Sequence, residues 1–133
     1  APADGWRQSD KRVPIPNGGY HWSISHKRLW VAAVIADSPV GIDIELVATR
    51  KTDLFDEAAT PVEWSMVGGR SWPTFFRIWT AKEAYLKRSG DGLSVDPRSL
   101  RVELDAGCVI DLRDQRRHPF QWQRFGRFIV SWL

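Results

Sequence analysis

The segment "VGIDIEL", residues 40–46, alternates aliphatic and acidic side chains in the pattern of a β-strand. Successive side chains of a strand point to opposite faces, so Asp43 and Glu45 share one face, about 7 Å apart, while Ile42 and Ile44 share the other. Two carboxylates on one face indicate either the solvated outer face of an antiparallel strand or a site for a cation. Charged residues elsewhere in the chain decide between these alternatives.

A long helix is predicted from about residue 72 to residue 89. Ser71 is a suitable N-cap, Pro73 falls in the first turn, and Gly90 is a residue that commonly ends a helix. The helix has an apolar stripe of residues at helical spacing. Its members are Trp72, Phe75, Phe76, Trp79 and Leu86.

A charged residue falls inside this apolar stripe. At 100° per residue Glu83 lies within the stripe, and Lys82 and Lys87 lie on its two borders. An ion pair between Glu83 and Lys87 is the simple explanation, but such a pair contributes only about 0.2–0.5 kcal/mol. Burying a carboxylate costs much more unless a cation accompanies it. Glu83 therefore joins Asp43 and Glu45 as a candidate ligand of a hard cation, for which Mg²⁺ is the natural choice.

The remaining segments predict an α+β fold. Residues 20–26 and 29–36 read as strands, the second apolar on both faces and therefore central, followed by a turn that makes a hairpin with residues 40–46. Residues 51–67 suit one or two short helices. Later strands are expected at residues 100–105, 108–112 and 121–133, with a basic loop at residues 113–119. This order favours an antiparallel sheet packed against a long helix and one or two short helices.

Composition limits the kinds of protein to consider. The 133 residues suit a single domain spanning residues 1–133, with residues 1–19 as an extended, Pro- and Gly-containing lead-in. The longest apolar run, residues 29–36, is far shorter than the roughly 20 residues of a transmembrane helix, so no membrane partner is expected. The single cysteine, Cys108, excludes an internal disulfide and suits the reducing cytoplasm.

The net charge of +3 favours acidic partners but does not identify them. Only residues 121–128, "QWQRFGRF", combine basic and aromatic side chains as single-strand binders do. A nucleic-acid partner would leave the acidic residues unexplained and would place carboxylates where phosphates must pass. We therefore expect no nucleic-acid partner.

Four motifs in order resemble the 4'-phosphopantetheinyl transferases. They are "SISH" at residues 23–26, "VGIDIE" at 40–45, "WTAKEAYLK" at 79–87 and "GDGL" at 90–93. In holo-acyl-carrier-protein synthases the serine-histidine strand comes late in the chain, whereas here it precedes "GIDIE". The chain is therefore more similar to the surfactin-synthetase-activating class.

This resemblance implies an α+β fold and a specific reaction. The phosphopantetheine arm of coenzyme A would pass to a serine of an apo acyl or peptidyl carrier protein, with release of adenosine 3',5'-bisphosphate. Asp43, Glu45 and Glu83 match the acids that bind Mg²⁺ in the family. Glu83 also matches the residue that takes the serine proton, and Lys87 matches a lysine that contacts the pyrophosphate.

The resemblance also assigns residues around these. His26, with Ser25 before it, matches a histidine near the 3'-phosphate of coenzyme A. Lys82 belongs to the lysine-glutamate pair of the family and is expected to contact the ligand, or else to be a solvated residue at the helix edge. Glu63, in "TPVEW", matches a further acid near the metal.

The chain departs from the family in length. Surfactin-type transferases have two lobes, and this chain begins close to where the first lobe ends, so it resembles a short or truncated member. A homodimer would supply the missing wall if two copies imitated the two lobes. The alternative function is a catalytically silent relative that binds coenzyme A or a carrier protein.

Overall fold

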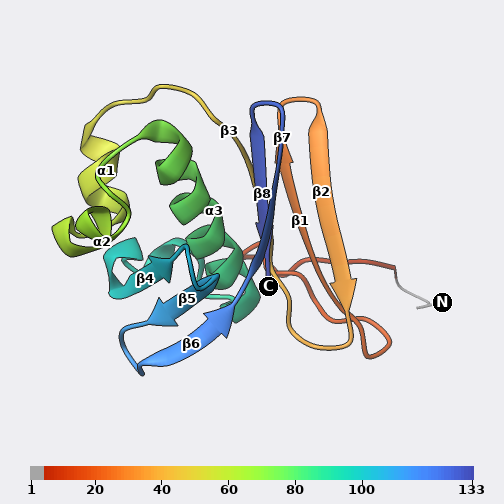
Figure 1. Ribbon diagram of the computed structural model, residues 1–133. Coiled ribbons are helices and arrows are strands. Elements are labelled where there is room, and N and C mark those ends of the chain that lie inside the picture. Colours follow the sequence, from red (N-terminus) through yellow and green to blue (C-terminus); the bar gives the residue numbers. More distant parts are fainter. Residues whose placement is uncertain (1–4) are drawn as a thin grey trace.

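A computed structural model describes residues 5–133 (Figure 1). Residues 1–4 of the predicted lead-in lie outside the described residues. The rest of the lead-in is not simply extended, because Gln8 bridges Pro14 and Asn17 bridges Tyr20 in antiparallel fashion. These bridges turn the segment back on itself twice before the first strand begins.

The fold is α+β, as predicted, and its strands form three small antiparallel sheets rather than one. The strands are β1 His21–Lys27, β2 Trp30–Ala36, β3 Ile42–Leu46, β4 Leu100–Glu103, β5 Cys108–Asp111, β6 Arg116–Pro119, β7 Gln121–Phe125 and β8 Phe128–Trp132. The sheets are β1–β2, β3–β8–β7 and β4–β5–β6. The predicted basic loop at residues 113–119 was partly wrong, since it contains β6.

The predicted hairpin between residues 29–36 and 40–46 is also wrong. β3 pairs with β8, with Asp43 opposite Ser131, and β2 pairs with β1 alone. β2 is therefore a sheet edge and not a central strand, and its residues Val31 and Ile35 are 63% and 58% exposed. Apolar character on both faces does not distinguish a central strand from an edge strand whose apolar side chains lie on the surface.

Serine hydroxyls connect β1 to the edge of β3 that does not face β8. Ile42 donates its backbone N–H to Ser23 Oγ, and Ile44 donates its own to Ser25 Oγ, each at 3.1 Å. These amides would otherwise be buried donors without acceptors, because alternate residues of an antiparallel strand bond to the same neighbour. The small side chains on β1 therefore hold it beside β3 without forming a regular ladder.

The helices match their predictions closely. They are α1 Asp53–Ala58, α2 Pro61–Met66 and α3 Trp72–Ser89, with the short 3₁₀ turns η1 Gly92–Ser94 and η2 Pro97–Ser99 after them. Ser71 caps α3 by accepting a hydrogen bond from the Thr74 amide, and Gly90 ends it with a left-handed φ of 78°. Local sequence signals therefore suffice to place this helix.

Helix α3 lies between the other two helices and the strands β3 and β8, and the β4–β5–β6 sheet lies below the helices in the view of Figure 1. The main core packs aromatic and aliphatic residues of the three helices against β4, β5 and β8, with Ile78, Leu86 and Ile129 almost fully buried. A smaller cluster packs Ile42 and Ile44 against β2 and β7. No helix among the described residues has the length and apolar character needed to cross a membrane.

Candidate functional site

Strand β3 approaches α3 unusually closely just before its two acids. A Cβ atom added to Gly41 would lie 1.9 Å from the backbone oxygen of Ala84, so only glycine fits there. This contact sets the acidic face of β3 against α3. Both faces of β3 are covered, and Asp43 is only 5% exposed, which rejects the solvated-face interpretation for this residue.

Asp43 has one satisfied and one unsatisfied carboxylate oxygen. Its Oδ1 accepts hydrogen bonds from Ser25 Oγ and from Lys87 Nζ, each at 3.1 Å. Its Oδ2 is buried and has no hydrogen-bond partner among residues 5–133. Burial, together with nearby Glu45 and Glu83, raises the pKa of Asp43 to about 7 against the opposing effect of Lys87. The site therefore contains more negative charge than its own lysine balances.

Glu83 faces the same region from α3. Its side chain is partly buried, and its Oε1 is a buried oxygen without a partner in the described part of the chain. Burial raises the pKa of Glu83, and Glu45 adds to the increase. The simple pairing with Lys87 is not found among the described ion pairs, because the Lys87 ammonium lies on Asp43 and also donates to the Ile42 carbonyl at 3.0 Å.

Glu45 is paired with a lysine that sequence reasoning missed. Lys27 Nζ at the end of β1 lies 3.1 Å from Glu45 Oε2. Alternation along β1 places Lys27 on the same side as Ser23 and Ser25, which both face β3. The signal available in the sequence was the regular spacing of Ser23, Ser25 and Lys27, two residues apart. Lys27 comes directly after the "SISH" motif.

The acids do not form a closed metal cluster in this arrangement of the described residues. No set of three or more Asp, Glu, His or Cys side chains in residues 5–133 converges closely enough to hold a metal ion. The arrangement nevertheless suits a cation, since Asp43 and Glu83 each keep a buried oxygen without a partner. Lysines already occupy the other oxygen of Asp43 and one oxygen of Glu45. The donor set is therefore that of a hard-cation site whose acids are partly neutralised by lysines.

Ser25 and His26 lie on opposite sides of β1. Ser25 is buried, and its hydroxyl is committed to Asp43 and to the Ile44 amide, so it orients the acid. His26 is exposed, and its ring points away from the face that carries Ser25. The structure therefore brings Ser25 into the acidic site and leaves His26 open to solvent.

Lys82 does not lie on the border of the helix face, as the sequence predicted, but in the protein interior. Lys82 is 0% exposed and Glu63 is 1% exposed. The ammonium donates to Glu63 Oε1 at 2.7 Å and to the carbonyls of Ala58 and Pro97 at 2.7 and 2.9 Å. Glu63 Oε2 accepts from the Val102 amide at 2.7 Å.

This pair corrects one prediction of position, because the solvated helix-edge interpretation of Lys82 is wrong. Glu63 forms its ion pair with Lys82, and its predicted place near the metal stays a prediction. Neither side chain reaches the solvent from which a ligand would bind. Because the two groups join α1, α2, η2 and β4 to α3, they form a structural connection through the core.

A basic cleft adjoins the acids. A cavity of about 420 Å³ is lined by Glu83 and Lys87 of α3, by Asp91 after it, and by Lys11 and Arg12 of the lead-in. Three cations from two separate segments thus line the cavity with two carboxylates. Such a cleft suits an anionic ligand that reaches the acids together with a metal ion.

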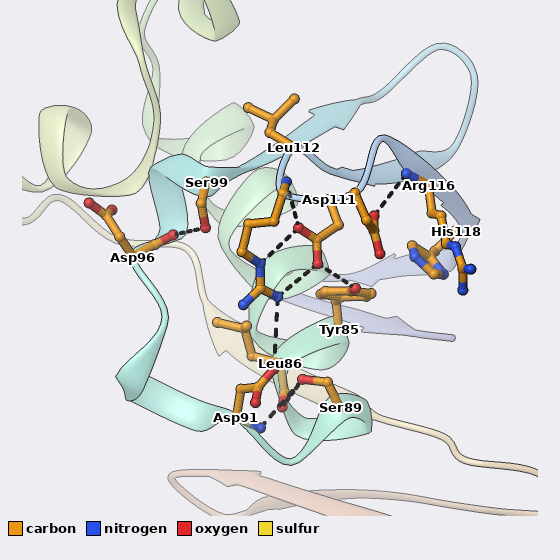
Figure 2. A network of polar contacts seen from close by, with 12 residues as sticks. Tyr85, Leu86, Ser89, Asp91, Asp96, Ser99, Asp111, Leu112, Arg116 and His118 are labelled. Carbon is orange, nitrogen blue, oxygen red and sulfur yellow. Dashed lines mark hydrogen bonds and ion pairs between the residues drawn. The ribbon is translucent and has the colours of Figure 1, made fainter.

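The last turns of α3, which carry Lys87, are held by a polar network. Figure 2 shows the Tyr85 hydroxyl pointing at Asp111 of β5, to which it donates at 2.8 Å. Arg113 donates to both oxygens of Asp111 at 2.9 and 2.7 Å and lies 3.8 Å from Asp91. These contacts lower the pKa of Asp111, with Arg113 the largest cause. The network ties the end of α3 and the following loop to β5.

The sequence matches a known family over the same elements. A family model described as the 4'-phosphopantetheinyl transferase superfamily matches residues 39–132. The chain belongs to this superfamily. The matched region contains β3 and α3, so the resemblance predicted from the motifs is confirmed.

Curated relatives carry the same family name. A 4'-phosphopantetheinyl transferase of Bacillus subtilis is 31% identical over 100 residues, which are 71% of this chain and 45% of the relative. The transferase gsp of Aneurinibacillus migulanus is 25% identical over 118 residues, 86% of this chain and 50% of the relative. The transferase psf-1 of Bacillus pumilus is 32% identical over 98 residues, 71% and 42% respectively. The chain thus spans about half the length of the curated relatives it matches.

Proposed function

We propose that the chain carries the transfer site of a 4'-phosphopantetheinyl transferase. The reaction moves phosphopantetheine from coenzyme A to a serine of an apo acyl or peptidyl carrier protein and releases adenosine 3',5'-bisphosphate. The observation that carries the proposal is the pair of buried, unpartnered oxygens on Asp43 and Glu83, next to a basic cleft. Membership of the superfamily supplies the reaction class.

Mg²⁺ would be held by Asp43, Glu45 and Glu83. When bound, it would neutralise charge on the pyrophosphate during transfer. Lys87 already lies at Asp43 and lines the cleft, so it is placed to contact the same phosphates. Lys11 and Arg12 of the lead-in add positive charge to the lining of the cleft.

Glu83 is the proposed acceptor of the serine proton. A general base works best when its pKa lies near the working pH, and burial raises the pKa of Glu83 above its usual value. Its free Oε1 is available to accept a hydrogen bond from an incoming hydroxyl. His26, which is exposed on β1, is the proposed contact for the 3'-phosphate of coenzyme A.

Two further properties belong to the proposal. A homodimer would cover the outer face of β2, where Val31 and Ile35 are 63% and 58% exposed. A cytoplasmic location suits the one free cysteine, Cys108. Size-exclusion chromatography with light scattering at several protein concentrations measures whether the chain forms a dimer.

Intact-mass spectrometry of an apo carrier protein tests the proposal. The carrier is incubated with this chain, coenzyme A and Mg²⁺, in parallel with the variants Glu83→Gln and Glu103→Gln. We expect the carrier to gain one phosphopantetheine with the unaltered chain. The same gain is expected with Glu103→Gln, because Glu103 lies on β4 and pairs with Arg117. Glu83→Gln should not support the gain.

The same experiment separates the transferase from a silent relative. Coenzyme A binding without any gain of mass on several carrier proteins would leave only the binding function. Transfer that persists with Glu83→Gln would refute the role of this residue. Chelation of divalent cations should stop the transfer by the unaltered chain.

A further inference from the structure

Lys27 is a charged residue at the acidic site, and it has no role in the proposed reaction. It is the last residue of β1, and its ammonium lies 3.1 Å from Glu45 Oε2. The Glu45 side chain is 19% exposed and the Lys27 side chain 35% exposed, so the pair is accessible from solvent. The same carboxylate belongs to the proposed metal-binding set.

The two lysines at the acids are held differently. Lys87 donates to Asp43 and also to the backbone oxygen of Ile42, at 3.1 and 3.0 Å. Lys27 has only the ion pair to Glu45 among the described contacts. A lysine held by one partly exposed ion pair can leave it at little cost, because its long stem rotates freely and water replaces the partner.

There is space for Lys27 to move. Lys27 and Glu45 line a groove of about 310 Å³ together with Phe75, Phe76 and Trp79. Displaced from Glu45, the ammonium would have open space in this groove.

We infer that Lys27 competes with the divalent cation for Glu45 and so weakens metal binding at this site. The ammonium occupies one oxygen of Glu45 and neutralises part of the negative charge that would attract a metal ion shared with Asp43 and Glu83. The inference rests on the proposed function, because it requires that Asp43, Glu45 and Glu83 bind the cation.

The test measures Mn²⁺ binding to the intact chain without substrate, by calorimetry and by the electron spin resonance of free Mn²⁺. The unaltered chain is compared with Lys27→Ala, Lys27→Arg and the exposed control Lys51→Ala. Lys27→Ala should bind Mn²⁺ about two- to fivefold more tightly, the range that corresponds to an exposed ion pair. Lys27→Arg and Lys51→Ala should bind like the unaltered chain, and thermal unfolding verifies that each variant is folded.

An increase in Mn²⁺ affinity would not result from structural damage to the variant. If Lys27→Ala binds Mn²⁺ equally or more weakly, the inference fails while the metal site stands. If coenzyme A affinity falls and Mn²⁺ affinity does not change, Lys27 is a phosphate contact and not a competitor. If neither the unaltered chain nor Lys27→Ala binds Mn²⁺, the proposed metal site itself fails, and the inference fails with it.

Discussion

Replacing Lys82 by methionine should destabilise the protein strongly, because Lys82 supports the core. The ammonium makes two buried hydrogen bonds, to Glu63 and to the Ala58 carbonyl, and a partly buried one to the Pro97 carbonyl. Methionine has nearly the shape of lysine without the charge, so Lys82→Met removes these bonds and leaves little empty space. Glu63 then remains as an unpaired carboxylate that is 1% exposed.

The expected cost is about 3–5 kcal/mol, the usual loss when one partner of a buried ion pair is removed. It is a large part of the roughly 5–15 kcal/mol by which a domain is stable. The Val102 amide still donates to Glu63 Oε2, which limits the loss. Protonation of Glu63 limits it further, since burial already raises the pKa of this carboxyl.

Urea unfolding followed by tryptophan fluorescence measures the effect, and its pH dependence identifies the cause. In Lys82→Met the folded-state pKa of Glu63 lies above its unfolded value near 4.5, so the folded state holds a proton that the unfolded state releases. The unfolding free energy of the variant should therefore fall as pH rises above 4.5 and recover on acidification. The double variant Lys82→Met with Glu63→Met should be more stable than Lys82→Met alone at pH 8.

A different result would refute this reasoning. A loss below about 1 kcal/mol, which is typical of an exposed pair, would mean that Lys82 is not a buried structural cation. If that small loss came with a large fall in coenzyme A affinity, Lys82 would be a ligand contact, as the family resemblance implied. Equal stability of the single and double variants at pH 8 would show that the remaining charge of Glu63 is not the cause.

Two further predictions concern β3. Asp43→Asn should abolish Mn²⁺ binding yet raise the unfolding free energy in metal-free buffer at pH 8 by about 4 kcal/mol, because the folded-state pKa of Asp43, about 7, lies well above its unfolded value of 3.8. The gain should shrink as pH falls toward the unfolded value of 3.8, and a less stable variant at pH 8 would contradict it. Gly41→Ala should lower the free energy of unfolding in urea by about 3 kcal/mol or more, because its Cβ would overlap the backbone oxygen of Ala84. Unchanged stability would mean that β3 and α3 do not approach each other so closely.

Much of the candidate site was predictable because its signals are local. Alternation along residues 40–46 places Asp43 and Glu45 on one face, and the chemistry of helix ends places α3 between Ser71 and Gly90. The motifs identified the family, which the comparison confirms. Each of these inferences uses residues within one or two turns or strands, where geometry follows directly from the sequence.

Predictions that required a knowledge of neighbouring elements were the ones that failed. The helical projection placed Glu83 inside the buried stripe and Lys82 on its border, yet Lys82 is the fully buried charge. A projection gives the angle of a side chain around its own helix, but it does not say how far the packed elements extend around that helix. In the same way, the apolar faces of β2 did not reveal that β1 is the only strand paired with it among residues 5–133.

The sequence by itself determined the long helix, the acidic face of β3 and the family. Only the tertiary structure decided which cation meets which acid: Lys87 with Asp43, Lys27 with Glu45, and Lys82 with Glu63. Pairing and burial depend on elements that are distant in the sequence and are brought together by the core, whereas helix caps and strand alternation depend on neighbours in the chain. Hence the chemistry of the site was visible in the sequence, and its electrostatic balance was not.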